Sequence, residues 1–514
     1  MEIKITDIHR DTDKGDTRVL GFYQTPVEPE YEYGDPETEN IVQALIQAGD
    51  FKGAVGEVFS LTVFREGSLE KVILVGLGKK ELIDFSTIRK AVNCAVKEAI
   101  RIKAKKLEMS PLGARAGLRE RDVARLITEI SILSVYSFDT YKAEKRDITL
   151  EKIHIPWNDP TSPSVIEGYY EGMVLGTATA QARDLVNEPA NVLDPIELAR
   201  RAVELGKQSG FDVEIMHKEQ IEKLGMKAFL EVARASDIPP QLIVMRYNGT
   251  DRPGADITAL VGKGLTYDTG GLSIKTNEGM DTMKRDMGGA ASVLGAISAV
   301  ARLNLKVHVV GVIAACENMV SGRSYRPGDI IGSMAGKSIH VGNTDAEGRL
   351  TLIDSIHYAL EKEKADRIID LATLTGDATR TMGHTADVVL SNDDELVAEL
   401  EKASEFSGER VFRMPIYDEH RELILSDQAD LTNAPVKAKT IAAGAFIREF
   451  VQGKPWLHID IAPTAWANED TGYRSKGGTG TEVRNIYYLL KGLYGSTVKV
   501  PAGAVTERQE DKGV

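Results

Sequence analysis

The feature that most constrains the fold is a series of short apolar runs in the second half of the chain. They stand at 241–245, 258–262, 306–315 and 367–372, and a helical pattern over 280–303 lies among them. Strands that are apolar throughout need cover on both faces, which is typical of a parallel sheet flanked by helices. We therefore expect an α/β fold whose larger domain has a mostly parallel central sheet, with ligands at the carboxyl ends of its strands.

The length of the chain, 514 residues, indicates more than one domain, because single hydrophobic cores stop growing near ~250–300 residues. A Pro- and Ser-rich stretch at 158–164 precedes a long helical pattern over 165–186, which ends in a segment with two prolines. We place the domain junction there. The expected parts are an N-terminal α/β domain (1–164), a connecting helix and linker (165–190), a larger C-terminal domain (191–498) and a polar tail (499–514).

The N-terminal domain has weaker but readable signals. A strand is predicted at 71–75, followed by helices over 84–104, with Ser86 or Thr87 as the N-cap, and over 119–133. The Gly76-x-Gly78 pair lacks the third glycine of a dinucleotide fingerprint, so a plain strand-to-helix turn is the better interpretation.

Composition excludes several classes of protein. The chain has 63 Lys and Arg against 77 Asp and Glu, a net charge of −14, which disfavours nucleic acid as the main ligand. It has no run of 18 apolar residues, which argues against a membrane protein, and its first ten residues are too charged for a signal peptide. Two cysteines, Cys94 and Cys316, cannot form a disulfide framework, and a reducing compartment, the cytoplasm, fits best.

The residues that could carry chemistry lie between 261 and 350. Four carboxylates, Asp268, Asp286, Asp345 and Glu347, stand among glycines and small residues that permit close approach of a ligand. In extended geometry, Asp345 and Glu347 would point to one face. Acids that converge repel one another unless a cation is present, and four carboxylates can share two divalent ions. Taken singly, each acid is equally compatible with a helix cap or a solvated turn.

Read together, these segments resemble the leucyl (cytosol) aminopeptidase family. Residues 343–350, Asn-Thr-Asp-Ala-Glu-Gly-Arg-Leu, are similar to its signature, and blocks at 263–271 and 286–290 match in order and spacing. The same holds for shorter blocks at 184–191, 316–319 and 370–376. The resemblance spans about residues 180–490.

The resemblance implies a dinuclear metal site. Asp268 and Glu347 would bridge two divalent ions, Lys263 and Asp286 would complete the firmly held one, and Asp345 would help to hold the exchangeable one. The ions implied are Mn²⁺ or Zn²⁺, with Mg²⁺ as an option at the exchangeable site. As a nitrogen ligand, the lysine would have to be neutral.

The resemblance also implies a catalytic pair, Lys275 and Arg349. The first would steady the substrate oxyanion, and the second would hold a bicarbonate that acts as general base. Outside the motif, a surface lysine and an arginine paired with a neighbouring acid are the ordinary interpretations.

The activity implied is release of N-terminal amino acids, leucine and other apolar residues preferred, from short peptides by attack of a metal-bridging water or hydroxide. The implied substrate pocket comprises Met283, Thr373, Gly376, Ala462 and Ala465, although methionine and alanine are also common core residues. The chain departs from the usual family pattern at Tyr267, Thr269, Asp377 and Pro463. These departures leave the substrate preference open, not the reaction.

The resemblance further implies a homohexamer, with short peptides as partners and no membrane. The rival interpretation is that the same fold serves mainly as a binding or DNA-associated regulatory protein. The sequence contains neither a His-Glu-x-x-His nor a Gly-x-Ser-x-Gly motif, and the segment 332–338 is one residue short of a P-loop.

Overall fold

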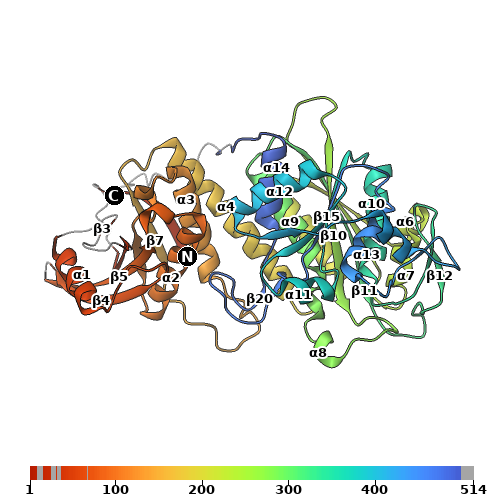
Figure 1. The fold of residues 1–514 in the computed structure, drawn as a ribbon, viewed down its shortest axis with the longest axis horizontal. Coiled ribbons are helices and arrows are strands. Elements are labelled where there is room, and N and C mark those ends of the chain that lie inside the picture. Colours follow the sequence, from red (N-terminus) through yellow and green to blue (C-terminus); the bar gives the residue numbers. More distant parts are fainter. Residues whose placement is uncertain (9–14, 25–29, 32–35, 66, 499, 501–514) are drawn as a thin grey trace, which may run out of the picture. The chain divides into compact units, whose positions relative to one another are not determined.

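The computed structural model describes residues 1–8, 15–24, 30–31, 36–65, 67–498 and 500, and the chain forms two compact units (Figure 1). Of the described residues, the smaller unit takes Met1–Thr177, Asp470–Ser475 and the chain end from Val498. The larger unit takes Ala178–Glu469 and Lys476–Thr497. The division falls within the long helix α4 (Pro163–Asn187). Apart from Val500, the tail expected at 499–514 lies outside the described residues.

The smaller unit is built on a seven-stranded sheet of order β1-β7-β6-β2-β5-β4, with β3 beside β2. Its strands are β1 (Glu2–Asp7), β2 (Thr17–Tyr23), β3 (Glu30–Tyr31), β4 (Val58–Arg65), β5 (Ser68–Gly78), β6 (Lys106–Met109) and β7 (Lys152–Trp157). Its helices are α1 (Pro36–Ala48), η1 (Lys80–Leu82), α2 (Phe85–Arg101), η2 (Ala114–Ala116) and α3 (Glu120–Val135).

Alternation along β5 explains why this sheet has two cores. Val72 and Leu74 point into a small cluster that includes Val42 of α1, whereas Ile73 and Val75 point into the larger cluster formed with α2 and α3. The predicted strand and both helices are present here. The predicted N-caps of α2 are wrong.

The N-cap of α2 is Asp84, whose carboxylate accepts from the Thr87 N–H at 2.7 Å. Aspartate is as good an N-cap as serine or threonine, so residue type alone could not decide among Asp84, Ser86 and Thr87.

The larger unit contains an eight-stranded sheet of order β16-β15-β18-β14-β10-β11-β9-β8. The central strands β18, β14, β10 and β11 are parallel, as predicted, while the pairs β15–β18, β11–β9 and β9–β8 are antiparallel. The strands of the sheet are β8 (Asp212–Met216), β9 (Gln241–Asn248), β10 (Ile257–Asp268), β11 (His308–Asn318), β14 (Arg367–Ala372), β15 (Asp387–Ser391), β16 (Val411–Arg413) and β18 (Trp456–Asp460). Short strands outside it are β12 (Ile330–Gly332), β13 (Ser338–His340), β17 (Leu431–Thr432), β19 (Trp466–Ala467) and β20 (Gly477–Gly478).

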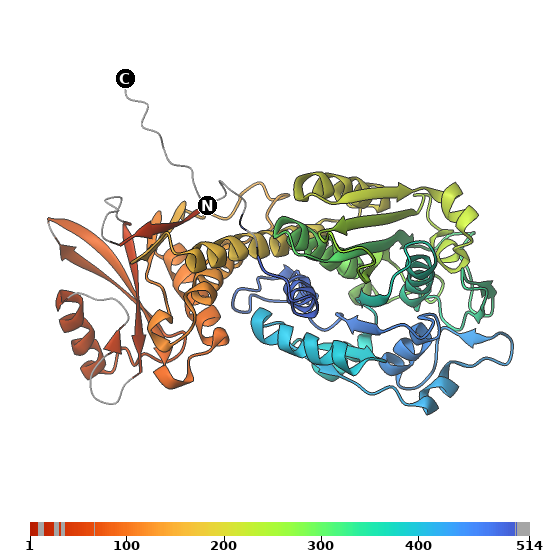
Figure 2. The ribbon, with the colours of Figure 1, turned by 90° about the horizontal axis from the view of Figure 1, so that it is seen from above.

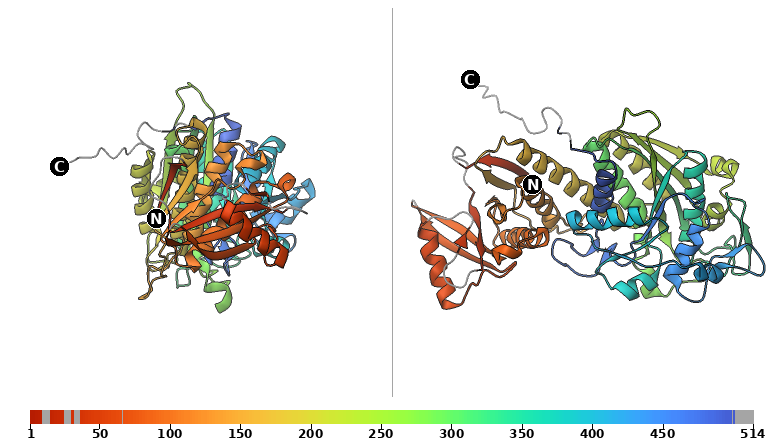
Figure 3. Two further views of the ribbon diagram at one scale, coloured as in Figure 1. Left: turned by 90° about the vertical axis from the view of Figure 1, so that its left-hand side faces the viewer. Right: turned by 45° about the horizontal axis from the view of Figure 1, so that its top comes forward.

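Helices cover both faces of this sheet, as Figures 2 and 3 show for the larger unit. One face packs against α5 (Pro195–Ser209), α9 (Gly288–Arg302) and α12 (Asp394–Ser407), and α14 (Val483–Leu493) packs on α9 and α12. The other packs against α7 (Lys227–Ala233), α10 (Gly348–Glu361) and α13 (Lys439–Arg448). The remaining helical segments are α6 (Lys218–Leu224), α8 (Asn277–Met280), η3 (Met283–Met287), α11 (Gly376–Met382) and η4 (Asp418–Ile424). None of the helices in the described part of the chain is long and apolar enough to cross a membrane.

The continuous helix predicted over 280–303 is wrong. The chain forms α8, a 3₁₀ turn η3, and only then α9. The break coincides with close packing of the start of α9 on the sheet, because a Cβ on Gly289 would lie 2.0 Å from the Leu371 carbonyl oxygen. Periodicity in the sequence does not report such an approach.

The carboxyl ends of the parallel strands lie at one edge of the sheet. They are Asp268 of β10, Asn318 of β11, Ala372 of β14 and Asp460 of β18. The P-loop-like segment 332–338 lies elsewhere, as the turn of the β12–β13 hairpin, so the strand-loop-helix context of a phosphate loop is missing.

Candidate functional site

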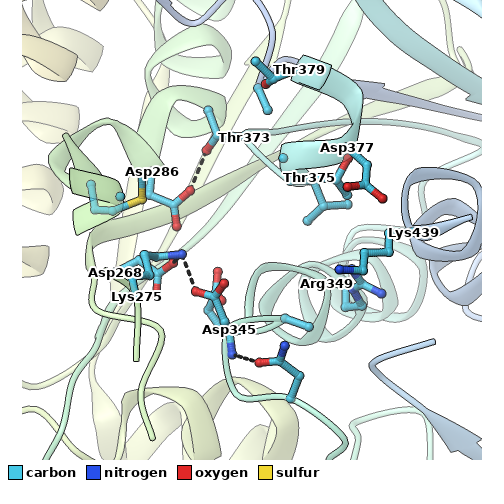
Figure 4. Close-up of a pocket in the computed structure, with 18 of the residues that line it drawn as sticks. Asp268, Lys275, Asp286, Asp345, Arg349, Thr373, Thr375, Asp377, Thr379 and Lys439 are labelled. Carbon is cyan, nitrogen blue, oxygen red and sulfur yellow. Dashed lines mark hydrogen bonds and ion pairs between the residues drawn. The ribbon is translucent and has the colours of Figure 1, made fainter. Parts of the chain in front are cut away.

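A cavity of about 490 Å³ lies at this edge of the sheet, and all seven residues predicted to bind metal or to catalyse line it (Figure 4). They come from five places in the chain: β10, the loop that follows it, η3, the turn before α10 and the first turn of α10. The seven are Lys263, Asp268, Lys275, Asp286, Asp345, Glu347 and Arg349.

Three of the carboxylates form a buried cluster. Asp268 ends β10, Asp286 lies in η3 and Glu347 precedes α10, and each offers an oxygen within 4.8 Å of the others. Asp345 is more open, with a side chain 34% exposed. The extended geometry assumed for Asp345 and Glu347 is wrong, since the first lies in a turn and the second has helical angles. Both nevertheless line the cavity.

Lys263 lies between two of these acids. Its Nζ donates to Asp286 Oδ1 at 2.7 Å and to the Thr373 carbonyl at 3.1 Å, and it lies 2.9 Å from Glu347 Oε1. Burial opposes its charge, but the attraction of Asp286 and Glu347 outweighs burial and raises the pKa of Lys263. Gly348 makes this arrangement possible, because a Cβ there would lie 2.5 Å from Lys263 Cε.

Lys275 lies on the loop after β10, which turns at Gly270 with φ 84°. Its ammonium is 2.7 Å from Asp268 Oδ2 and also pairs with Asp345. Burial again opposes the charge, and attraction by Asp268 and Glu347 raises the pKa of Lys275. In this structure, therefore, the two lysines balance part of the negative charge.

The balance is incomplete. Burial, followed by repulsion from Glu347 and Asp286, raises the pKa of Asp268 to about 8. Burial raises the pKa of Asp286 to about 6 although Lys263 acts against it. Glu347 has a lowered pKa, because the two lysines outweigh its burial, yet its Oε2 is buried without a hydrogen-bond partner. An additional cation would match this donor set.

A second layer of side chains orients the acids. Asn318 Nδ2 and the Gly270 N–H each donate to Asp268 Oδ1 at 2.8 Å, and Thr373 Oγ1 donates to Asp286 Oδ1 at 2.9 Å. Sequence reasoning did not assign Asn318, although the residue belongs to the short block at 316–319. Thr373, predicted for the substrate pocket, thus also positions an acid.

Arg349 lies in the first turn of α10 and is only 6% exposed. Its Nη1 donates to the Asn433 carbonyl at 2.7 Å, and its Nε is buried without a partner. Burial lowers the pKa of Arg349 to about 10, so the side chain stays cationic at neutral pH. Asn433 was not predicted. Asn433 connects Arg349 to the turn before α10, since its Nδ2 also donates to the Asn343 carbonyl at 2.8 Å.

The residues predicted for substrate specificity divide into two groups. Met283, Thr373, Gly376 and Ala462 line the cavity. Ala465 is 3% exposed, does not line it, and lies behind it toward Gly288, whose added Cβ would be 3.5 Å from that of Ala465. Further lining residues that sequence reasoning did not single out include Arg285, Arg380 and Lys439.

Comparison with known proteins agrees with this geometry. Residues 180–487 match the model of the cytosol aminopeptidase family catalytic domain, and residues 19–145 match that of its N-terminal domain. A Clostridium perfringens protein named probable cytosol aminopeptidase is 47% identical over 457 residues, covering 88% of this chain and 92% of its own. The cytosol aminopeptidase of Pseudomonas aeruginosa is 40% identical over 464 residues, covering 89% and 92%. Among solved structures, the bottromycin maturation enzyme BotP in complex with Mn superposes with a TM-score of 0.83 at 30% identity, covering 94% of this chain and all of that one.

Proposed function

Because the chain belongs to the cytosol aminopeptidase family, and is therefore an aminopeptidase, we propose that it is a metal-dependent enzyme that releases leucine and other apolar N-terminal residues from short peptides. The observation that carries this proposal is the convergence of four carboxylates and three basic side chains on one cavity. Acids gathered in this way favour bound cations.

Two divalent ions fit the donor set. Lys263 and Asp286, with Asp268 and Glu347 shared between the ions, would hold one firmly, because a nitrogen ligand favours transition metals such as Mn²⁺ or Zn²⁺. The neighbouring acids raise the pKa of Lys263, so binding of this ion would have to displace the proton of the ammonium. Asp345 and the shared pair offer only oxygen to the other, which would exchange more readily and also accept Mg²⁺. The unpartnered Glu347 Oε2 supports this fit, and the Mn in the BotP complex supports manganese. When bound, the ions would polarise the scissile carbonyl and activate water.

We propose that Lys275 stabilises negative charge on the substrate. It now pairs with Asp268 and Asp345, the acids that cations would otherwise balance. An ammonium released from them would face the carbonyl oxygen as charge develops on it, and one such donor typically contributes a factor of ~10²–10³ in rate.

We propose that Arg349 holds a small anion. Its buried Nε has no protein partner, whereas Nη1 is fixed by the Asn433 carbonyl, so the guanidinium is oriented before any ligand arrives. We propose that this anion is bicarbonate, which would accept a proton from the attacking water. Planar oxyanions suit the guanidinium fork.

The remaining parts of the proposal concern specificity and setting. Met283, Gly376 and Ala462 give the cavity an apolar, uncrowded wall suited to a leucine-like side chain. An unblocked α-amino group of the substrate would lie beside the acids of the candidate metal site, and this would account for cleavage at the N-terminus of a peptide. We also propose a cytoplasmic homohexamer; the name of the family and the two free cysteines support the location.

The test is hydrolysis of leucine p-nitroanilide by metal-stripped protein, with Mn²⁺, Zn²⁺ and Mg²⁺ added back one at a time. We expect little activity without metal, recovery that depends on the ion, and no cleavage of the N-acetylated substrate. Full activity in chelator, or equal cleavage of the acetylated compound, would contradict the proposal. A gel shift on the same preparation tests the rival DNA-binding role.

A further inference from the structure

Three basic side chains of the cavity have no role in the proposed reaction: Arg285, Arg380 and Lys439. Lys439 is the first residue of α13 and lines the cavity. Figure 4 draws it on the same side as Arg349, with Asp268, Asp286 and Asp345 on the other side. Lys275 is drawn among these acids, and Asp377 is drawn on the side of Lys439, where it pairs with Arg380. The acids of the candidate metal site therefore lie opposite Lys439 and Arg349.

Lys439 differs from the other basic residues of the cavity in its contacts. Six basic side chains line the wall. Lys263, Lys275 and Arg380 pair with carboxylates, and Arg349 donates to a carbonyl oxygen. Arg285 forms no such contact among the described residues but is attracted by the adjacent Asp286. Among the described residues, none forms a hydrogen bond or ion pair with the Lys439 ammonium. Lys439 is exposed and, unlike Arg285, does not stand next to an acid of the site, so a ligand could pair with it at no cost to another interaction.

The local structure does not explain a lysine here. The positive end of the helix dipole makes a cation at the first position of α13 unfavourable, and the first turn contains no acid. The preceding Ala438 has φ 48°, a conformation that favours glycine, and supplies no cap. The following Thr440 is buried, and its hydroxyl lies 2.7 Å from that of Thr375, a lining residue. The helix start is thus fixed on the cavity wall.

We propose that Lys439 binds a carboxylate of the peptide on the C-terminal side of the scissile bond, in the first place the terminal carboxylate of a di- or tripeptide. The inference rests on the proposed function, which puts the amino terminus of the peptide beside the acids of the candidate metal site. A short peptide carries opposite charges at its two ends, and in the cavity the acids of the candidate metal site lie opposite Lys439. Extended chain spans at most ~3.3–3.6 Å per residue, so each added residue carries the terminal carboxylate farther from the acids, and di- and tripeptides are the substrates to compare.

The experiment compares Leu-Gly and Leu-Gly-Gly with their C-terminal amides, using the metal-loaded wild-type enzyme and Lys439→Ala. For at least one free acid, the KM of Lys439→Ala should be about fivefold higher than that of wild type, which is the upper range for an exposed charge pair. The kcat for that acid, and both KM and kcat for the two amides, should be unchanged. Lys439→Arg should preserve the preference for the acid. Lys437→Ala, an exposed neighbour that does not line the cavity, should change nothing.

A second pair of substrates identifies the source of the carboxylate. If Lys439→Ala raises KM for Leu-Glu-amide but not for Leu-Gln-amide, the bound carboxylate belongs to an acidic side chain. If KM rises only for the free acids, the bound carboxylate is that of the chain terminus. Equal changes for acids and amides, or none at all, would overturn the inference. If the wild-type enzyme cleaves neither acids nor amides, the proposed function fails, and the inference fails with it.

Discussion

Removal of Lys263 from the metal-free protein is the sharpest test of how the charges of this site are balanced. The side chain is 3% exposed and contacts Asp286 at 2.7 Å, Glu347 at 2.9 Å and the Thr373 carbonyl at 3.1 Å. Lys263→Met keeps most of the apolar stem but leaves two buried carboxylates without their cation. Loss of one partner of a buried ion pair typically costs ~3–5 kcal/mol, and the near-zero exposure here leaves little screening to reduce that cost.

The assay is calorimetric unfolding in excess chelator at pH 7, following the transition of the larger unit, since two units need not unfold together. For a unit of this size, ~1 kcal/mol shifts Tm by roughly 2 °C, so we expect Lys263→Met to melt about 8 °C lower than wild type. Adding Glu347→Gln should recover part of the loss because one unpaired charge is removed. Lys437→Met, an exposed control, should leave Tm unchanged. A Lys263→Met protein that melts within about 1 °C of wild type would refute the reasoning.

Three further changes test other parts of the molecule. Lys275→Ala should keep its metal content and lose ~10²–10³ in turnover; a near-normal rate would remove its assigned role. Asp345→Asn should lose one metal per chain on dialysis and keep the other, as measured by elemental analysis, and loss of both or neither would contradict two unequal sites. Burial raises the pKa of Asp354 to about 7 from an ordinary 3.8, so its contribution to stability is fully present below about pH 4 and is lost as the pH rises through 7. Denaturant unfolding between pH 5 and 8 should therefore show a decline that is smaller in Asp354→Asn, with the remainder due to groups such as Asp268 and Asp286, whose pKa values are also raised.

The sequence was sufficient for the parts of the fold that follow from local pattern. Apolar runs at 241–245, 258–262 and 367–372 are strands, because continuous apolar character requires cover on both faces, and α2 and α3 follow from periodicity. The seven candidate metal and catalytic residues line one cavity because parallel strands end at one edge of the sheet. Their chemical roles remain predictions.

What the sequence could not provide depends on contacts between distant segments. The break between α8 and α9 coincides with the approach of Gly289 to Leu371, and the position of Ala465 behind the cavity depends on how it packs near Gly288. Composition at a single position does not distinguish a lining residue from one just behind it. Lys439 was missed for the same reason, since in the sequence nothing distinguishes it from the nearby Lys437.

The small residues around the acids have the clearest physical account. In the 343–350 segment, Gly348 lets the start of α10 reach Lys263, because an added Cβ would lie 2.5 Å from Lys263 Cε and 2.9 Å from its Nζ. Gly270 turns the chain after β10 with φ 84° and donates its N–H to Asp268. One glycine therefore serves a close approach and the other a backbone conformation. Both bring basic or acidic groups of separate elements within hydrogen-bonding distance, so the spacing of glycines in these blocks reports the geometry of the site as directly as the acids report its charge.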